Sequence, residues 1–298
     1  MPDQMNTQPI FNRMAIVGVG LIGGSLGMAA RRHKLVSSVV GIGRSEPKLM
    51  RAKLLGAIDE YTLDMESGAA GADLVVVCTP VRTIVPTLRR LAPRLDYGAI
   101  VSDVGSTKGE LVREAEEIVS PHAHFIGGHP MAGSEQSGVE SAFPDLFVGA
   151  TYVITPSEGT DLKALAKLTA FVVALGAKAE IMSPEEHDRA VAVISHLPHA
   201  ISSALLQLAE LAQKDTGKAF RLAAGSFRDL TRISDSPPEI WRDICLTNSE
   251  ALIDAIDRLV MILNRLREAV LSKDEKAVEG YFEVARNIRD TFVRMSKL

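Results

Sequence analysis

Three glycines near the start of the chain, Gly18, Gly20 and Gly23, lie between a short β-prone run and a stretch that suits a helix. In this spacing the first glycine allows a tight turn, the second lets the backbone approach a pyrophosphate, and the third lets the helix pack closely on the strand. The helix N-terminus then presents free N–H groups to the phosphates. The motif therefore predicts a dinucleotide site, which we expect to include Leu21 and Ile22, and it favours a redox enzyme.

Over the first 182 residues, short apolar runs alternate with segments that suit helices. We expect strands at residues 14–19, 39–43, 73–78, 99–102, 124–126, 150–155 and 177–182. Strands that alternate with helices in this way are typical of a mostly parallel sheet covered on both faces. The pattern predicts a Rossmann-type α/β domain over residues 1–182. One of its helices is expected from about residue 108, with Thr107 as its cap and Glu110 completing a capping box.

The pattern changes at Ser183, where a capping box with proline at the first helical position begins. From there to Leu298 we find no convincing strand, so residues 183–298 are predicted to form an all-helical domain. Pro198 lacks a backbone N–H and is expected to kink the helix that contains it. Apolar residues between 252 and 270 step alternately by four and three, as in helices that pack along a seam. This seam favours a homodimer through the C-terminal helices; packing within the same chain is the alternative.

The composition argues against several classes of partner. The net charge is −4 and no block of the chain is dense in lysine or arginine, which argues against nucleic-acid binding. No apolar run approaches the roughly 18 residues that span a bilayer, and the polar start of the chain lacks the pattern of a signal peptide. Cys78 and Cys245 are far apart and show no metal-ligand spacing. We therefore expect a cytoplasmic protein with no membrane, nucleic-acid or metal partner.

The end of the second predicted strand bears on the choice of cofactor. An NAD site usually places an acidic residue here to bind the ribose hydroxyls. This chain has Gly43 at that place, followed by Arg44 and Ser45, which suit a 2′-phosphate. Glu46 adds a negative charge, and a solvated loop arginine is the alternative. The loop favours NADP over NAD.

Further polar residues follow the ends of predicted strands, where open α/β sheets bind their ligands. Thr79 and Pro80 are expected to form a wall of the cofactor crevice, with a simple turn as the alternative. Ser106 lies at a strand-to-helix turn, where a catalytic role competes with helix capping. His129 stands between glycines and a proline just after a predicted strand. A buried, hydrogen-bonded histidine is the simpler reading, but this place favours proton chemistry.

The helical half carries two more polar groups. His196 and His199 are three residues apart and so share one helix face. Such a pair could suggest a metal, but no nearby Asp, Glu or Cys completes an evident ligand set. Arg228 and Arg232 have helical i, i+4 spacing, and arginine suits bidentate binding of a carboxylate. A surface ion pair is the alternative for Arg232.

Six motifs together carry a resemblance to a known family. They are Gly-x-Gly-x-x-Gly-Gly-Ser at residues 18–25, Cys-Thr-Pro-Val at 78–81, Asp-Val-Gly-Ser-Thr-Lys at 103–108, Gly-Gly-His-Pro-Met-Ala-Gly-Ser-Glu at 127–135, Ser-His-Leu-Pro-His at 195–199 and Arg-Asp-Leu-Thr-Arg at 228–232. The chain resembles the prephenate/arogenate (cyclohexadienyl) dehydrogenases of tyrosine biosynthesis. The resemblance implies NAD(P)-dependent oxidation of a cyclohexadienol with loss of CO₂, forming 4-hydroxyphenylpyruvate or tyrosine. Which of the two substrates is preferred stays open.

The resemblance also implies roles for individual residues. His129 would take the proton of the substrate 4-hydroxyl as hydride leaves for nicotinamide, with Ser106 assisting. Arg232 would bind the ring carboxylate. The side-chain end of the substrate would lie against Ser195, His196 and His199.

Two more residues, Glu135 and Asp229, are implied to steady the histidine loop and the arginine. Relative to some members, we expect neither a mutase-like domain before Met14 nor a regulatory domain after Leu298. Two other functions stay open: a reductase of the β-hydroxyacid dehydrogenase type, and a non-catalytic NADP-binding sensor. The histidine pair argues against the first, and the intact His129 argues against the second.

Overall fold

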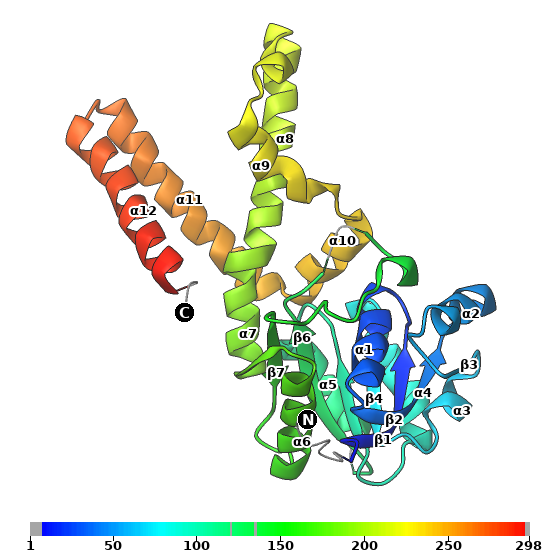
Figure 1. Cartoon of the computed structure of the whole chain (residues 1–298). Coiled ribbons are helices and arrows are strands. Elements are labelled where there is room, and N and C mark those ends of the chain that lie inside the picture. Colours follow the sequence, from blue (N-terminus) through cyan, green and yellow to red (C-terminus); the bar gives the residue numbers. More distant parts are fainter. Residues whose placement is uncertain (1–7, 120, 134–135, 296–298) are drawn as a thin grey trace, which may run out of the picture. The chain divides into compact units, whose positions relative to one another are not determined.

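The computed structural model describes residues 8–119, 121–133 and 136–295 (Figure 1). The described chain forms two compact units, one ending at Asn248 and one beginning at Ser249. The first unit holds the sheet and most of the helices, and the second consists of two helices.

An eight-stranded sheet forms the framework of the first unit, in the order β3-β2-β1-β4-β5-β6-β7-β8. The strands are β1 (Phe11–Val17), β2 (Val36–Ile42), β3 (Glu60–Thr62), β4 (Leu74–Val77), β5 (Ile100–Asp103), β6 (His124–Pro130), β7 (Thr151–Thr155) and β8 (Lys178–Ile181). All neighbouring strands pair in parallel except β6 and β7, which are antiparallel. The Rossmann-type, mostly parallel sheet is confirmed.

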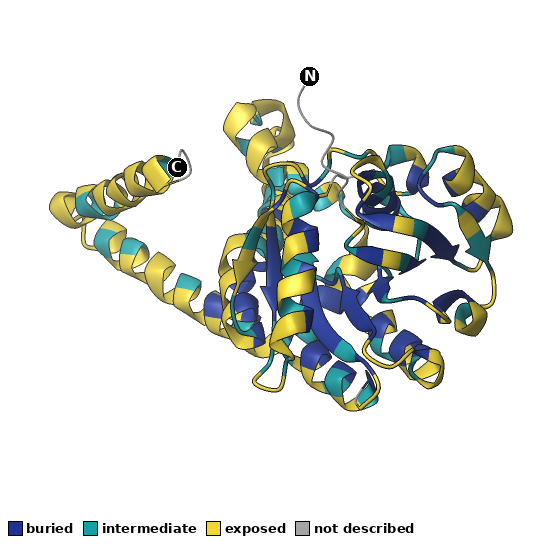
Figure 2. Ribbon diagram, turned by 60° about the horizontal axis from the view of Figure 1, so that its bottom comes forward, coloured by how far each residue is buried: buried dark blue, intermediate teal, exposed yellow. Residues whose placement is uncertain are grey.

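Helices cover both faces of this sheet. They are α1 (Leu21–Arg32), α2 (Glu46–Leu54), α3 (Met65–Ala69), α4 (Val81–Leu91), α5 (Gly109–Val119) and α6 (Leu162–Ala174), with short 3₁₀ turns at η1 (Ala92–Arg94) and η2 (Val139–Ser141). Alternate residues of β1 enter two different cores: Met14 and Ile16 pack with α1 and α6, whereas Ala15 and Val17 pack with α4 and α5. Because successive side chains of a strand point to opposite faces, a strand covered on both sides is apolar throughout. Figure 2 shows the central strands in the dark blue of buried residues.

Further helices complete the first unit. They are α7 (Pro184–Val191), a π-helical turn η3 (Ala192–His196), α8 (Leu197–Thr216), η4 (Ala219–Leu222), α9 (Gly225–Thr231), η5 (Arg232–Asp235) and α10 (Pro238–Thr247). The predicted capping box at the start of α7 is present: Ser183 Oγ accepts the Glu186 N–H at 3.1 Å, and the Glu186 carboxylate accepts the Ser183 N–H at 2.9 Å. The π turn ends two residues before Pro198, which has no N–H to offer an α-helical hydrogen bond.

The second unit is a pair of helices, α11 (Ser249–Leu271) and α12 (Glu275–Met295), which pack against each other. A tight turn joins them, with Lys273 at a φ of 54°. Most of their residues are exposed, as the yellow ribbons of Figure 2 show.

Two local expectations were wrong, and one strand was missed. Strand β6 does not end at Ile126 but continues to Pro130, because its second half pairs with β7, with His129 opposite Val153. The short edge strand β3 was missed. Thr107 does not cap α5: its hydroxyl lies 2.9 Å from that of Thr247, and Asp188 accepts the free N–H groups at the start of the helix instead.

One helical run of the described chain, Pro184–Thr216, is long and apolar enough to cross a membrane by length and composition alone. Its first turns, in α7, pack against α5 and β7 of the first unit. Its second half has exposed apolar side chains, among them Leu206, Leu208 and Leu211.

Candidate active site

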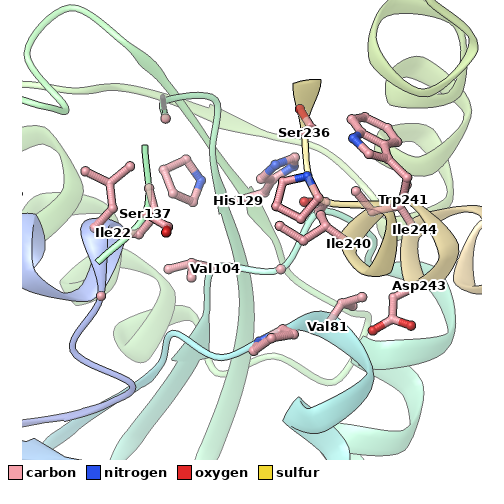
Figure 3. Close-up of a pocket in the computed structure, with 18 of the residues that line it drawn as sticks. Ile22, Val81, Val104, His129, Ser137, Ser236, Ile240, Trp241, Asp243 and Ile244 are labelled. Atoms are coloured by element: carbon pink, nitrogen blue, oxygen red, sulfur yellow. The ribbon is translucent and has the colours of Figure 1, made fainter. Parts of the chain in front are cut away.

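A cavity of about 770 Å³ opens at the carboxyl ends of β1, β4 and β5, within the first unit (Figure 3). This edge is where open α/β sheets bind ligands. Among the residues that line it are Gly20, Leu21, Ile22, Thr79, Pro80, Ser106, His129, Ser195, His196, His199, Ile240, Trp241 and Asp243. The first five belong to the predicted cofactor site, and the others come from the β5–α5 turn, from β6 and from the helices that follow the sheet. One cavity therefore brings together residues that lie more than two hundred positions apart.

The glycine loop after β1 fits a dinucleotide. Gly18 has a φ of 93°, and a Cβ on Gly23 would lie 2.3 Å from the Gly18 carbonyl oxygen, so neither position admits a side chain. A Cβ on Gly20 would meet nothing within 4 Å, which leaves open space beside the backbone. No side chain caps α1 and its first turn has no acidic residue, so its N–H groups are available to an anion. The Thr79 hydroxyl is buried at the same cavity without a hydrogen-bond partner among the described residues.

Arg44 and Ser45 follow the end of β2 and do not line the cavity. Arg44 is exposed and forms no ion pair with any residue that the structure describes. The neighbouring Glu46 accepts a hydrogen bond from the Tyr61 hydroxyl at 3.3 Å.

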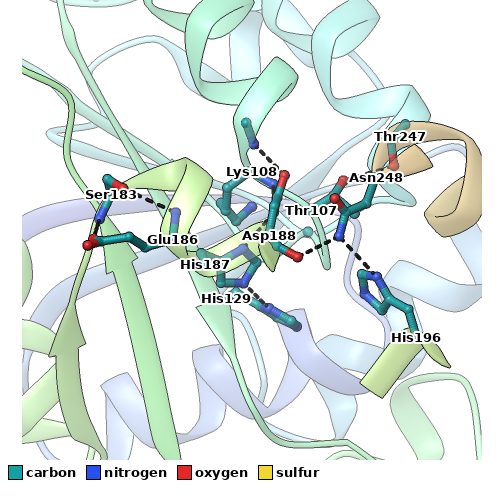
Figure 4. Close-up of polar contacts among 12 residues, drawn as sticks. Thr107, Lys108, His129, Ser183, Glu186, His187, Asp188, His196, Thr247 and Asn248 are labelled. Atoms are coloured by element: carbon teal, nitrogen blue, oxygen red, sulfur yellow. Dashed lines mark hydrogen bonds and ion pairs between the residues drawn. The ribbon is translucent and has the colours of Figure 1, made fainter. Parts of the chain in front are cut away.

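His129 lies on β6 and lines the cavity, and its ring contacts a buried polar chain behind it (Figure 4). His129 Nδ1 lies 2.8 Å from His187 Nε2, and His187 Nδ1 lies 2.7 Å from Asp188 Oδ1. The Asp188 carboxylate also accepts the backbone N–H groups of Lys108 and Gly109, each at 2.8 Å. His187 is completely buried.

A buried ion pair fixes the loops on either side of His129. The ammonium of Lys108 contacts the carboxylate of Asp103, and both side chains are completely buried. Asp103 also accepts the N–H groups of Gly105, at 2.7 Å, and Gly128, at 3.1 Å. Because a buried charge is tolerated only with partners, this pair holds the β5–α5 turn and the end of β6 in one arrangement.

The surroundings of His129 favour its neutral form. Burial lowers its pKa well below the usual value, and the charge of Lys108 and the neighbouring His187 and His196 lower it further. At pH 7 the ring therefore keeps an unprotonated nitrogen, as a general base requires.

The histidine pair on the helical side has defined hydrogen-bond partners. Asn248 Nδ2 donates to the Asp188 carbonyl at 2.8 Å and lies 3.2 Å from His196 Nδ1, so that nitrogen acts as an acceptor. Burial lowers the pKa of His196 to about 4, although the charge of Asp188 opposes this shift. His199 Nδ1 donates to the Ser195 carbonyl at 2.9 Å, and its ring stacks on Trp241 with the ring centres 3.6 Å apart.

Comparison with known proteins agrees with this geometry. The family model described as prephenate dehydrogenase, nucleotide-binding domain, matches residues 26–181, and the model described as prephenate dehydrogenase, dimerization domain, matches residues 183–284. The chain belongs to the prephenate dehydrogenase family.

Individual relatives of this family are similar over most of the chain. Prephenate dehydrogenase of Bacillus subtilis is 36% identical over 92% of this chain and 74% of its own. The crystal structure of Aquifex aeolicus prephenate dehydrogenase with hydroxyphenyl propionate and NAD⁺ superposes with a TM-score of 0.89, at 34% identity over 97% of this chain and all of the other. Synechocystis arogenate dehydrogenase gives a TM-score of 0.84, also at 34% identity, over 94% of this chain and 99% of its own.

Several residues expected at the site of this family member lie elsewhere. Arg232 begins η5 and is exposed, one residue before Ile233, which does line the cavity. Asp229 is exposed on α9, and Glu135 lies outside the described residues. Gly18 and Gly23 shape the glycine loop without lining the cavity.

Other residues at the site were missed from the sequence. His187 and Asp188 were not considered, although they directly follow the capping box that was recognised. Trp241 was not considered either, and the available signal was that it is the one tryptophan of the sequence. Asp243 lines the cavity and pairs with Arg242 at 2.7 Å.

Proposed function

We propose that the protein is an NAD(P)-dependent dehydrogenase that converts prephenate, arogenate or both to 4-hydroxyphenylpyruvate or tyrosine by oxidative decarboxylation. The observation that carries the proposal is the one cavity in which a dinucleotide loop and a partly buried His129, whose pKa is lowered, face the same space. The relatives named for prephenate and arogenate support it.

The glycine loop would hold the pyrophosphate of the dinucleotide, whose nicotinamide would supply the acceptor for the C4 hydride of the substrate. His129 accepts the proton of the 4-hydroxyl, which strengthens electron donation from that oxygen as the C4–H bond breaks. The electrons of the bond to the ring carboxylate then complete the aromatic ring as CO₂ leaves. They reach the oxygen at C4, and His129 returns the proton to it. The site therefore holds one proton through the reaction and releases none.

The other proposed roles rest on position in the cavity for Ser106, Ser195, His196 and His199. For Arg232, Asp229 and Glu135 they rest on the family resemblance. Ser106, at the β5–α5 turn, assists at the 4-hydroxyl. Ser195, His196 and His199 bind the substrate's side-chain end, where His199 is held by Trp241. Arg232 binds the ring carboxylate, with Asp229 and Glu135 as supporting residues. Placing the substrate against both the cofactor and the base supplies much of the rate, because it makes the reaction effectively unimolecular.

For the cofactor, we propose a preference for NADP. The exposed guanidinium of Arg44 and the hydroxyl of Ser45 follow the end of β2, where the ribose of a bound dinucleotide would lie. A 2′-phosphate would give that cation its partner. The NAD⁺ in the Aquifex aeolicus structure belongs to that protein and leaves NAD as the alternative.

We further propose a division into residues 1–182, which bind the dinucleotide, and 183–298, which bind substrate and form a cytoplasmic homodimer. The dimerization-domain match over residues 183–284 supports the dimer, as do the exposed apolar side chains of the second unit.

One assay tests the function. The purified protein is given prephenate or arogenate, each with NAD or NADP, and the reduced nicotinamide is followed at about 340 nm, the wavelength at which it absorbs. We expect turnover with at least one substrate and a higher kcat/KM with NADP. No turnover in any combination, together with NADP binding, would instead support a sensor.

A further inference from the structure

We propose that His187 and Asp188 position the base: they form a hydrogen-bonded chain that sets the ring tautomer of His129 and supports its charge when it takes the substrate's proton. The second part rests on the proposed function, whereas the first does not. The chain runs from Asp188 Oδ1 to His187 at 2.7 Å and from His187 to His129 at 2.8 Å.

The Asp188 carboxylate at the end of the hydrogen-bonded chain determines the direction of each hydrogen bond. A carboxylate oxygen only accepts, so His187 Nδ1 carries the hydrogen that points to Asp188. A neutral His187 then has its lone pair on Nε2, the atom that faces His129. His129 Nδ1 must therefore carry a hydrogen, and its Nε2 is left unprotonated. The Asp188 carboxylate, as an acceptor, thus decides which nitrogen of His129 can act as the base.

The carboxylate at the end of the chain is itself held firmly. Asp188 accepts the N–H groups of Lys108 and Gly109 at the start of α5, so both its oxygens are engaged. A helix N-terminus also favours negative charge. Asn248 donates to the Asp188 carbonyl and fixes the backbone of the same residue. The chain therefore ends on a carboxylate that α5 orients and stabilises.

Charge balance gives the chain a second role. The groups around His129 are Lys108 with its partner Asp103, His187, His196 and Asp188. Burial and the Lys108 charge both disfavour a protonated His129. When His129 Nε2 takes the substrate's proton, the hydrogen bond from its Nδ1–H to His187 strengthens. The His187 ring in turn donates to the Asp188 carboxylate. The positive charge is thereby spread toward Asp188 until the proton returns to the product oxygen.

A direct test reads the tautomer in the unchanged protein. With ¹⁵N-labelled histidine, two-bond ¹⁵N–¹H spectra distinguish protonated from unprotonated ring nitrogens. The His129 signals are those that disappear in His129→Asn. We expect His129 with hydrogen on Nδ1 and none on Nε2 at neutral pH. Hydrogen on Nε2, or a mixture of the two tautomers, would overturn the proposal, whatever the enzyme assays show.

Two matched variants then test whether the side chain at position 187 must contact His129. In His187→Gln the side-chain amide lies near the site of Nε2 and can still accept from His129. In His187→Asn the side chain is shorter and its amide can reach only Asp188. We expect His187→Asn to lower kcat by about 10- to 100-fold, the scale on which partners of a functional histidine act. The KM values for substrate and cofactor should change little, and the Nδ1–H tautomer should be lost. His187→Gln should keep the tautomer and recover most of kcat.

The outcomes are distinguishable. Equal kcat in the two variants and the wild type, with an unchanged tautomer, would refute the positioning role. A folded wild type with the expected tautomer but no turnover would refute the proposed function and leave the hydrogen-bonded chain standing. If His187→Asn does not fold, which a thermal melt shows, the tautomer of the wild type still decides.

Discussion

His129 lines the same cavity as the glycine loop, and its neighbours set its protonation state. Burial lowers its pKa first, and Lys108, His187 and His196 add to the effect. A solvated histidine on the same strand would be partly protonated near neutral pH. Here the lowered pKa favours the neutral ring at pH 7, so in the proposed role His129 would be ready to accept a proton, although as a weaker base than a solvated imidazole.

The pH dependence of kcat/KM should show this shift. A base must be unprotonated, so activity falls as pH drops through its pKa, and a lowered pKa moves that fall to more acid pH. We expect kcat/KM to stay level from pH 7 to below about 6.5, the ordinary histidine value. His129→Asn should lower kcat by about 10²- to 10⁴-fold and remove this acid limb. A limb centred at or above pH 6.5 in the wild type would contradict the assignment.

A second prediction for a single residue concerns Arg232, which lies beside the cavity and not in its wall. It is exposed on η5, next to Ile233 of the cavity wall. If it binds the ring carboxylate, Arg232→Ala should raise the substrate KM about 10-fold or more with a smaller change in kcat, because a charge-assisted contact is lost. Arg221→Ala, in which another exposed arginine is removed, is the control. Initial-rate kinetics that show an unchanged KM would remove Arg232 from the site.

Among the elements, helix α7 links stability to the site. Its capping box fixes where the helix begins, and this start places His187 and Asp188 in its first two turns. The π turn η3 then shifts the helical register before α8, where His199 lies. Such π turns occur often at functional sites. Two features of local sequence, the Ser183 cap and Pro198, thus affect the positions of His187, His196 and His199.

Removing the cap should cost stability. In Ser183→Ala the Glu186 N–H loses its acceptor, and we expect the free energy of unfolding to fall by about 1 kcal/mol. Ser183→Thr retains a hydroxyl and should lose much less. Urea unfolding at one fixed protein concentration measures both, since assembly would shift the midpoint. Equal midpoints for the alanine variant and the wild type would show that the cap contributes little.

On the scale of the whole molecule, the second unit carries an exposed apolar surface. Val284, Ile288 and Phe292 are spaced four residues apart on α12, and each is more than half exposed. Side chains four apart share one face of a helix. An exposed apolar stripe of this kind marks an interaction site, in agreement with the dimerization-domain match.

Charges placed on this stripe should weaken the homodimer. We expect the wild type to sediment as a dimer at micromolar concentration and Ile288→Glu/Phe292→Glu to shift toward monomer, because burying two unpaired carboxylates is costly. Leu54→Glu, at an apolar residue of α2 that is 78% exposed, is the control and should remain a dimer. A monomeric wild type, measured by sedimentation equilibrium, would refute the dimer.

The sequence by itself determined what depends on neighbouring residues. The glycine spacing, the alternation of strands and helices and the Ser183 cap are local patterns, and each was readable because backbone conformation and capping act over a few residues. Local sequence also singled out His129, His196 and His199, and the family resemblance gave them roles; all three line one cavity.

Only the tertiary structure decided which distant groups meet. His129 and His187 are 58 residues apart, and Asp188 reaches the start of α5 across 80 residues. The antiparallel pairing that extends β6 through His129 also depends on a strand far along the chain. Such contacts are set by the packing of whole elements, which satisfies buried polar groups with whatever partner the fold brings near. The sequence therefore pointed to His129, and the packing placed its Nδ1 against His187 Nε2.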